Sequence, residues 1–81
     1  MKIHVRYFGP LRESLGLEQE EWTFADEPSV GLILADIAER YPGVARLLTS
    51  CRVAVDMAYA GSDVTVPDGA EVAIIPPVAG G

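Results

Sequence analysis

The chain has 81 residues, 49% of them hydrophobic, and twelve acidic against six basic side chains give it a net charge of −6. These values indicate one globular domain with a single core, and the negative charge argues against a nucleic-acid partner because it repels phosphate backbones. No apolar run approaches the roughly 18 residues of a membrane-spanning helix, and no signal-peptide pattern is present, so we expect a cytoplasmic protein without membrane segments. Cys51 is the only cysteine, which excludes an intramolecular disulfide and a thiolate metal cluster.

The first part of the chain predicts two strands on either side of a short helix. Residues 2–8 alternate between an apolar face and a polar face; the apolar positions are Ile3, Val5 and Tyr7, and the others are Lys2, His4, Arg6 and Phe8. Gly9-Pro10 separates this strand from a short helix over residues 11–15. Residues 17–24 form the second strand, and its acidic cluster (Glu18, Glu20 and Glu21) is expected to be solvated.

A long amphipathic helix is predicted after Ser29, whose hydroxyl can cap the first free N–H groups. Apolar residues then recur at helical spacing and form one broad stripe: Val30, Ile33, Leu34, Ile37, Ala38 and Tyr41. Pro42-Gly43 ends the helix, and residues 44–48 add one further turn. The stripe predicts that this helix packs on one face of a sheet.

The second half of the chain predicts short extended segments, over residues 52–56, 58–60, 64–66 and 71–75. In the last of these, Val72 and Ile74 alternate with Ala73 and Ile75. Asp56-Met57 is read as a tight reversal and Pro67-Asp68-Gly69 as a turn. One long helix crossing a mixed sheet gives a two-layer α+β domain, in which a right-handed crossover makes the first and last strands parallel neighbours in mid-sheet.

The far face of this sheet is expected to carry an apolar patch at the end of the last strand. Phe8 and Ile75 would lie side by side there, with Tyr59 near them. Such a patch indicates a docking surface. The alternative is scattered surface hydrophobicity, which the sequence alone does not exclude.

The chain ends in an extended tail, residues 76–81, which follows a domain over residues 1–75. Pro76-Pro77 stops the last strand, and Gly80-Gly81 gives an end without side chains. We expect this flexible Gly-Gly tail to pass the α-carboxylate of Gly81 into a channel too narrow for side chains. The alternatives are an ordinary disordered terminus and glycines introduced by cloning.

No set of side chains in the sequence supports catalysis by this chain alone. There is one histidine and one cysteine, and no phosphate-binding glycine motif or metal-ligand spacing is present. The terminal carboxylate remains. A partner enzyme could adenylate it with ATP, and a sulfur donor could then convert it to a thiocarboxylate, so we expect no bound cofactor and no metal.

Several stretches resemble the small subunit of molybdopterin synthase, the MoaD family, within the MoaD/ThiS sulfur carriers. The most specific is residues 68–81, an Asp-Gly turn and strand followed by Pro-Pro-Val-Ala-Gly-Gly; residues 7–13, 28–30 and 52–56 add to it. The resemblance implies a ubiquitin-like β-grasp fold. It also implies that an E1-like adenylyltransferase of the MoeB type activates Gly81, and that a cysteine desulfurase or a rhodanese supplies the sulfur.

The resemblance further implies a large-subunit partner of the MoaE type, which the tail enters to donate sulfur to precursor Z (cyclic pyranopterin monophosphate). Two small and two large subunits would form a heterotetramer. The implied reactive residues are Gly80 and Gly81, and the implied partner contacts are Phe8, Arg12, Tyr59, Ile75, Pro76, Pro77, Val78 and Ala79. The chain departs from the family at Asp56, often Asn, and at Ile74-Ile75, often Phe-Phe.

Three other functions are compatible with the same residues. A sulfur carrier for thiamine thiazole synthesis or tRNA thiolation shares the fold and the Gly-Gly end. A ubiquitin-like modifier would join Gly81 to lysines of target proteins, and an inert interaction domain would not react at all. A gain in mass after sulfur loading, a lysine conjugate and no reaction distinguish these functions.

Overall fold

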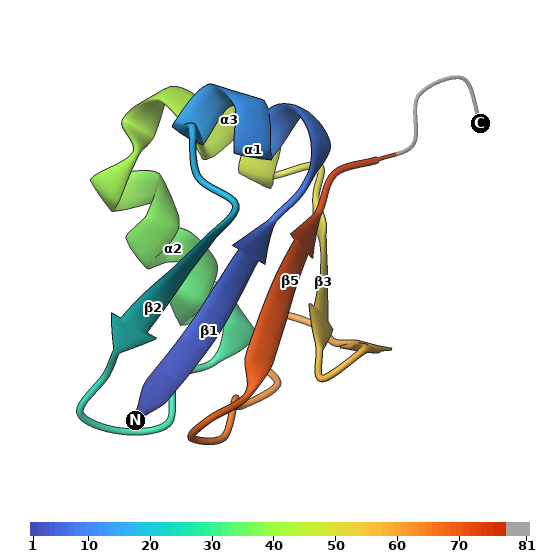
Figure 1. Ribbon diagram of the computed structural model, residues 1–81. Helices are drawn as coiled ribbons and strands as arrows, with labels where there is room; N and C mark the ends of the chain where they lie inside the picture. Colours follow the sequence, from blue (N-terminus) through green and yellow to red (C-terminus); the bar gives the residue numbers. More distant parts are fainter. Residues whose placement is uncertain (78–81) are drawn as a thin grey trace.

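The structure, a computed structural model, describes residues 1–77 and contains a five-stranded mixed sheet with the strand order β2-β1-β5-β3-β4. The strands are β1 (Lys2–Tyr7), β2 (Gln19–Thr23), β3 (Arg52–Val55), β4 (Ala58–Tyr59) and β5 (Glu71–Ile75). The helices are α1 (Gly9–Leu15), α2 (Val30–Arg40), the 3₁₀ turn η1 (Pro42–Val44) and α3 (Ala45–Leu48). Figure 1 shows α2 behind the sheet, with α1 and α3 at the end where β1 and β5 finish.

The two central strands confirm the predicted topology. β1 and β5 are parallel neighbours, while β2 and β3 pair antiparallel with them on the two sides. The chain therefore enters and leaves the domain through the middle of the sheet. Phe8 does not extend β1, as the alternation had suggested. It is the N-cap residue of α1, with an extended backbone and no side-chain capping hydrogen bond. The two-layer α+β class is confirmed.

The core forms between the inward face of the sheet and α2. Ser29 caps α2 as predicted, since its Oγ accepts a hydrogen bond from the N–H of Leu32 at 3.1 Å. Fourteen residues form the buried cluster: Ile3, Val5, Tyr7, Leu11, Val30, Ile33, Ile37, Val44, Leu48, Val53, Val66, Ala70, Val72 and Ile74. The predicted alternation of β1 and β5 is thus correct for every inward position. No helix in the described part of the chain has the length and apolar character to span a bilayer.

Residues 64–66 do not form the predicted strand. They make a single bridge, between Thr65 and Ser29, because the loop before them is tied to the start of α2 and not to the sheet. The N–H of Gly31 donates to the carbonyl of Ser62 at 2.8 Å. A Cβ on Gly31 would lie 3.2 Å from that carbonyl oxygen, so the close approach explains a glycine in the first helical turn.

The reversal between β3 and β4 is a two-residue hairpin turn with both central residues in the left-handed region. Asp56 has φ 46° and Met57 has φ 73°. Two positive φ values match the twist of the flanking strands, and Asp tolerates them well. The carboxylate of Asp56 also accepts a hydrogen bond from the N–H of Glu71 at 2.9 Å. The tight reversal predicted here is confirmed.

Glu20 is not the solvated residue that the acidic cluster suggested. It lies on the α2 side of β2, and only 16% of its side chain is exposed. Its two carboxylate oxygens accept hydrogen bonds from the hydroxyls of Tyr7 and Tyr41, both at 2.7 Å, and the guanidinium of Arg40 lies 3.9 Å away. Three elements, β1, β2 and the end of α2, are joined through this carboxylate.

We expect this network to make the fold sensitive to alkaline pH. Burial and the hydrogen bond to Glu20 raise the pKa of Tyr7, and the hydrogen bond to Glu20 raises the pKa of Tyr41. In the unfolded chain a tyrosine ionises near pH 10, so above about that pH the unfolded state loses protons that the folded state retains. Stability is therefore fully present below about pH 10 and falls above it.

Urea unfolding of the wild type and of Tyr7→Phe at about pH 8 and about pH 11 measures this effect. The loss of stability between the two pH values should be smaller in Tyr7→Phe. An equal loss in both proteins would show that the Tyr7 hydroxyl does not contribute.

Candidate functional site

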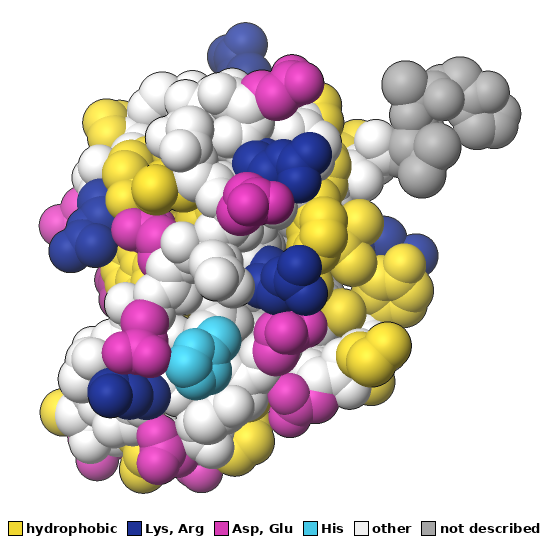
Figure 2. Space-filling view, viewed as in Figure 1, with side chains coloured by type: hydrophobic (Ala, Val, Ile, Leu, Met, Phe, Trp, Pro, Cys, Tyr) yellow, Lys and Arg dark blue, Asp and Glu magenta, His cyan; other side chains and the backbone are white. Residues whose placement is uncertain are grey.

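Three of the predicted contact residues surround a shallow depression on the face of the sheet opposite α2. Phe8, Tyr59 and Ile75 line it together with Ala54, Met57, Glu71 and Ala73, and its volume is about 280 Å³. Tyr59 and Met57 are 61% and 92% exposed, which is high for large apolar side chains in a small domain. Figure 2 shows one group of hydrophobic side chains on this side of the molecule, at the right of the view, with charged side chains next to it.

Two arginines lie against the aromatic rings of this patch. The guanidinium of Arg6 is 5.4 Å from the centre of the Phe8 ring, and that of Arg52 is 3.9 Å from the centre of the Tyr59 ring. Arg6 also lies 3.7 Å from the carboxylate of Glu71. Guanidinium groups stacked on aromatic rings keep their N–H donors available, so the rim of the patch is polar around an apolar centre.

Arg12 is not brought to the depression. It lies on α1, and its guanidinium is 3.4 Å from the carboxylate of Glu18, in the loop before β2. It does not line the depression formed by Phe8, Ile75 and the β3–β4 hairpin. A partner that contacts both Arg12 and the depression would have to extend over α1.

The tail begins at the edge of the patch. β5 ends at Ile75, and Pro76 then packs so closely on Gly9 that a Cβ there would lie 3.2 Å from the Pro76 ring. Gly9 also has a φ of 54°, in the left-handed region that favours glycine. Pro77 is exposed. The predicted site residues Val78, Ala79, Gly80 and Gly81 lie outside the described residues.

Sequence reasoning missed six of the residues that shape the patch: Arg6, Arg52, Ala54, Met57, Glu71 and Ala73. The alternation of β5 does place Ala73 on the same face as Ile75. However, alanine gives no pattern signal of its own, and the alignment of Ala73 with Ala54 depends on strand register.

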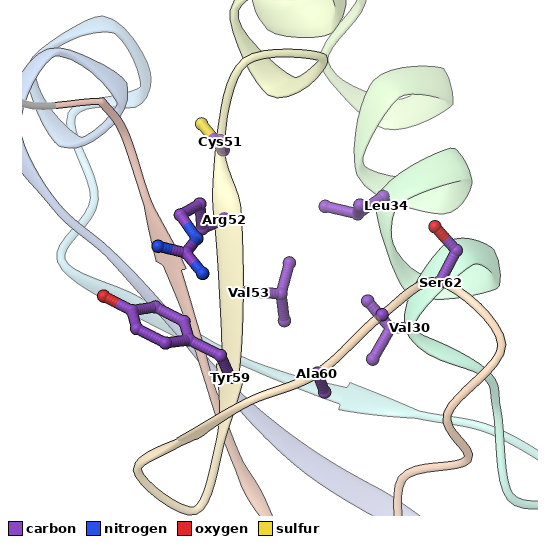
Figure 3. A pocket seen from close by; sticks show the side chains of 9 residues that line it. Val30, Leu34, Cys51, Arg52, Val53, Tyr59, Ala60 and Ser62 are labelled. Atoms are coloured by element: carbon purple, nitrogen blue, oxygen red, sulfur yellow. The ribbon is translucent and has the colours of Figure 1, made fainter.

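A second cavity, of about 350 Å³, lies between β3 and α2. Figure 3 shows Val30, Leu34 and Val53 on its side of β3, whereas Arg52 and Tyr59 project on the other side, toward the patch. Burial raises the pKa of the Cys51 thiol, which donates a hydrogen bond to the carbonyl of Leu47 at 3.3 Å. A thiol in this state is a poor nucleophile. Among residues 1–77 no cluster of three potential metal ligands occurs.

The strand order, the helix across one face and the exposed patch beside the last strand define a ubiquitin-like β-grasp domain. The sequence model of the ThiS family matches residues 5–81. The chain belongs to this family, within the MoaD/ThiS sulfur carriers that its residues had indicated.

Curated relatives carry two kinds of name. The molybdopterin synthase sulfur carrier subunit of Chlamydomonas reinhardtii is 32% identical over 83 residues, covering 100% of both chains. Small archaeal modifier protein 3 of Haloferax volcanii is also 32% identical, over 92 residues that again cover 100% of both chains.

Solved structures confirm the fold. The solution structure of a Haloferax volcanii protein has a TM-score of 0.86 at 28% identity, covering 100% of this chain and 87% of that one. A chain in the crystal structure of the BexX/CysO complex of Amycolatopsis orientalis has a TM-score of 0.72 at 27% identity, covering 98% and 99%.

Proposed function

We propose that this chain is the sulfur-carrying small subunit of a molybdopterin synthase, and that the carboxylate of Gly81 carries the sulfur. One observation supports this most: the central strand β5 leads directly from the apolar patch into Pro76 and Pro77, so a partner docked on the patch lies beside the start of the tail. The relative from Chlamydomonas reinhardtii, which aligns from end to end, bears that subunit's name.

The chemistry requires two activated forms of Gly81. A carboxylate oxygen attacks the α-phosphorus of ATP and pyrophosphate leaves, which gives an acyl-adenylate. The terminal sulfur of a donor persulfide then attacks the acyl carbon and AMP leaves. A thiol finally cleaves the sulfur–sulfur bond to the donor, and the thiocarboxylate remains as a soft nucleophile.

The groups that catalyse these steps belong to partners. In the described residues the one histidine, His4, is half-exposed beside Glu21, and the one thiol is half-buried and hydrogen-bonded. An E1-like adenylyltransferase of the MoeB type would supply the ATP site, and a cysteine desulfurase or a rhodanese the sulfur. A large subunit of the MoaE type would bind precursor Z, to which the thiocarboxylate donates its sulfur.

Mass spectrometry of the intact chain tests the proposal. After incubation with the activating enzyme, ATP and a persulfide donor, the mass should rise by the difference between sulfur and oxygen. The loaded chain and the large subunit should then convert precursor Z to molybdopterin. An unchanged mass with active enzymes from the same host would refute the proposal.

The relative named as an archaeal modifier supports a second candidate function, conjugation of Gly81 to lysine side chains. It uses the same acyl-adenylate, which a lysine amine attacks in place of sulfur. Higher-mass species with an isopeptide bond to lysine, formed without a sulfur donor, would favour this function.

Ile75→Glu is expected to weaken binding to the large subunit by about tenfold or more, equivalent to about 1.4 kcal/mol, with little effect on folding. Ile75 is half-buried in the patch, where glutamate would replace apolar contact area with a carboxylate that a docked partner must desolvate. Isothermal titration calorimetry measures the affinity and circular dichroism the thermal midpoint. Phe8→Glu should act in the same direction.

The matched control is Leu32→Glu, because Leu32 is a 47% exposed apolar residue on α2, away from the patch. It should leave the affinity unchanged. Equal loss of affinity in both variants would mean that the patch is not the docking surface.

A further inference from the structure

The floor of the patch is made of the smallest side chains on its face of the sheet. Strand register aligns Arg6 of β1 with Ala73 of β5, Ala73 with Ala54 of β3, and Ala54 with Tyr59 of β4. Two alanines are therefore adjacent in mid-sheet, with an arginine on one side and a tyrosine on the other. This row forms a hollow rather than a flat apolar surface.

The walls of the hollow are large and mostly apolar. Ile75 pairs with Arg52 in the row next to the alanines, with Phe8 following β1 on the same side. Met57 and Glu71 line the opposite side. The stacking of Arg52 on Tyr59, at 3.9 Å, closes the corner between two walls.

The size of the hollow suits one side chain. Its volume is about 280 Å³, and a cavity of about 150 Å³ is enough to hold a benzene ring. One leucine, methionine or phenylalanine side chain therefore fits with the backbone that carries it. Side chains inserted into such pockets contribute most of the affinity in many interfaces.

The charges at the rim of the hollow indicate which group of the partner would lie beside the inserted side chain. Four of the six basic side chains have a carboxylate within 4.0 Å: Lys2, Arg6, Arg12 and Arg40. In the described part of the chain Arg46 and Arg52 have none, although the protein carries a net charge of −6, and of these two Arg52 is the one that lies against the patch. Arg52 thus offers its donors at the rim to an outside acceptor.

We propose that the hollow over Ala54 and Ala73 receives a single bulky apolar side chain of the large subunit, and that an adjacent carboxylate of that subunit pairs with Arg52. This inference rests on the proposed function, since it names the chemistry of the partner's contact segment. The inference requires a particular shape of the surface as well as its hydrophobicity. Recognition of the shape and recognition of the hydrophobicity alone make opposite predictions for a substitution that fills the hollow.

The variant Ala73→Leu distinguishes recognition of the shape from recognition of the hydrophobicity alone. The substitution adds apolar area but fills the hollow, so we expect the affinity for the large subunit to fall by about tenfold or more. A patch recognised only for its hydrophobicity would bind equally well or more tightly, and that result would overturn the inference. Calorimetric titration of the large subunit gives both affinities.

Two controls accompany this variant. Thr23→Leu adds the same side chain at an exposed position of β2, on the same face but outside the hollow, and should not change the affinity. Ala73→Ser keeps the hollow open and should bind nearly as the wild type does. If Ala73→Leu does not fold, Ala73→Val replaces it, since a β-branched residue suits a strand and still adds apolar volume to the hollow; binding equal to or tighter than that of the wild type would overturn the inference.

The proposed pairing of Arg52 with a carboxylate of the large subunit is tested by the salt dependence of the affinity. Arg52→Gln should weaken binding and make the affinity less sensitive to salt, whereas Arg46→Gln, on α3, should do neither. Equal salt dependence in Arg52→Gln and the wild type would overturn this part. If the wild type does not bind the large subunit, the proposed function is refuted. If the wild type binds and none of these substitutions changes the affinity, only the inference is refuted.

Discussion

Deleting Gly81 is expected to abolish thiocarboxylate formation and leave the thermal midpoint of the protein unchanged. The buried cluster of the described residues ends at Ile74, and the last strand ends at Ile75. Removing the last residue is therefore expected to take nothing from this cluster. It does shift the terminal carboxylate by one position, and transfer reactions are sensitive to displacements of about 1 Å.

Intact mass after sulfur loading and a thermal melt test both halves of this prediction. Gly81→Trp should also block loading, because a large side chain beside the carbonyl hinders the enzymes that must surround it. Gly43→Ala is the matched control: a Cβ there meets nothing within 4 Å, so loading and stability should both persist. Sulfur loading of the shortened chain, or a marked fall in its midpoint, would contradict the prediction.

The order of elements and the faces of the strands were predictable because both depend on local patterns. Alternation identified the inward residues of β1 and β5, and the stripe of α2 identified Ile33 and Ile37. A right-handed crossover then left one arrangement for the first and last strands, which the structure confirms. These inferences required only neighbouring residues and general rules of chain geometry.

The features that were not predicted depend on residues far apart in sequence. Glu20 was expected to be solvated, because its two tyrosine donors lie 13 and 21 positions away. The hollow depends on the register that aligns Ala54 with Ala73. Residues 64–66 have a strand-like composition, but the loop before them is held by the first turn of α2. A local sequence pattern does not predict a feature that is determined by a tertiary contact.

Glu20→Ala is expected to lower the free energy of unfolding by about 2–4 kcal/mol, because each hydrogen bond to a charged group contributes about 1.5–3 kcal/mol and two hydroxyls lose their acceptor. The Tyr7 side chain is fully buried, so its hydroxyl has little access to water in compensation. Urea unfolding measures the effect. Glu21→Ala, on the exposed face of the same strand, is the matched control and should change the stability by about 0.5 kcal/mol or less.

The same variant separates stability from function. Glu20 lies on the α2 side of the sheet, whereas the patch and the start of the tail lie on the opposite face and at its end. Glu20→Ala should therefore accept sulfur as the wild type does at temperatures where it remains folded, the reverse of the Gly81 deletion. Loss of sulfur loading in folded Glu20→Ala would mean that this network also shapes the docking face. Small, equal losses of stability for Glu20→Ala and Glu21→Ala would show that the tyrosine hydrogen bonds contribute little to the free energy of unfolding.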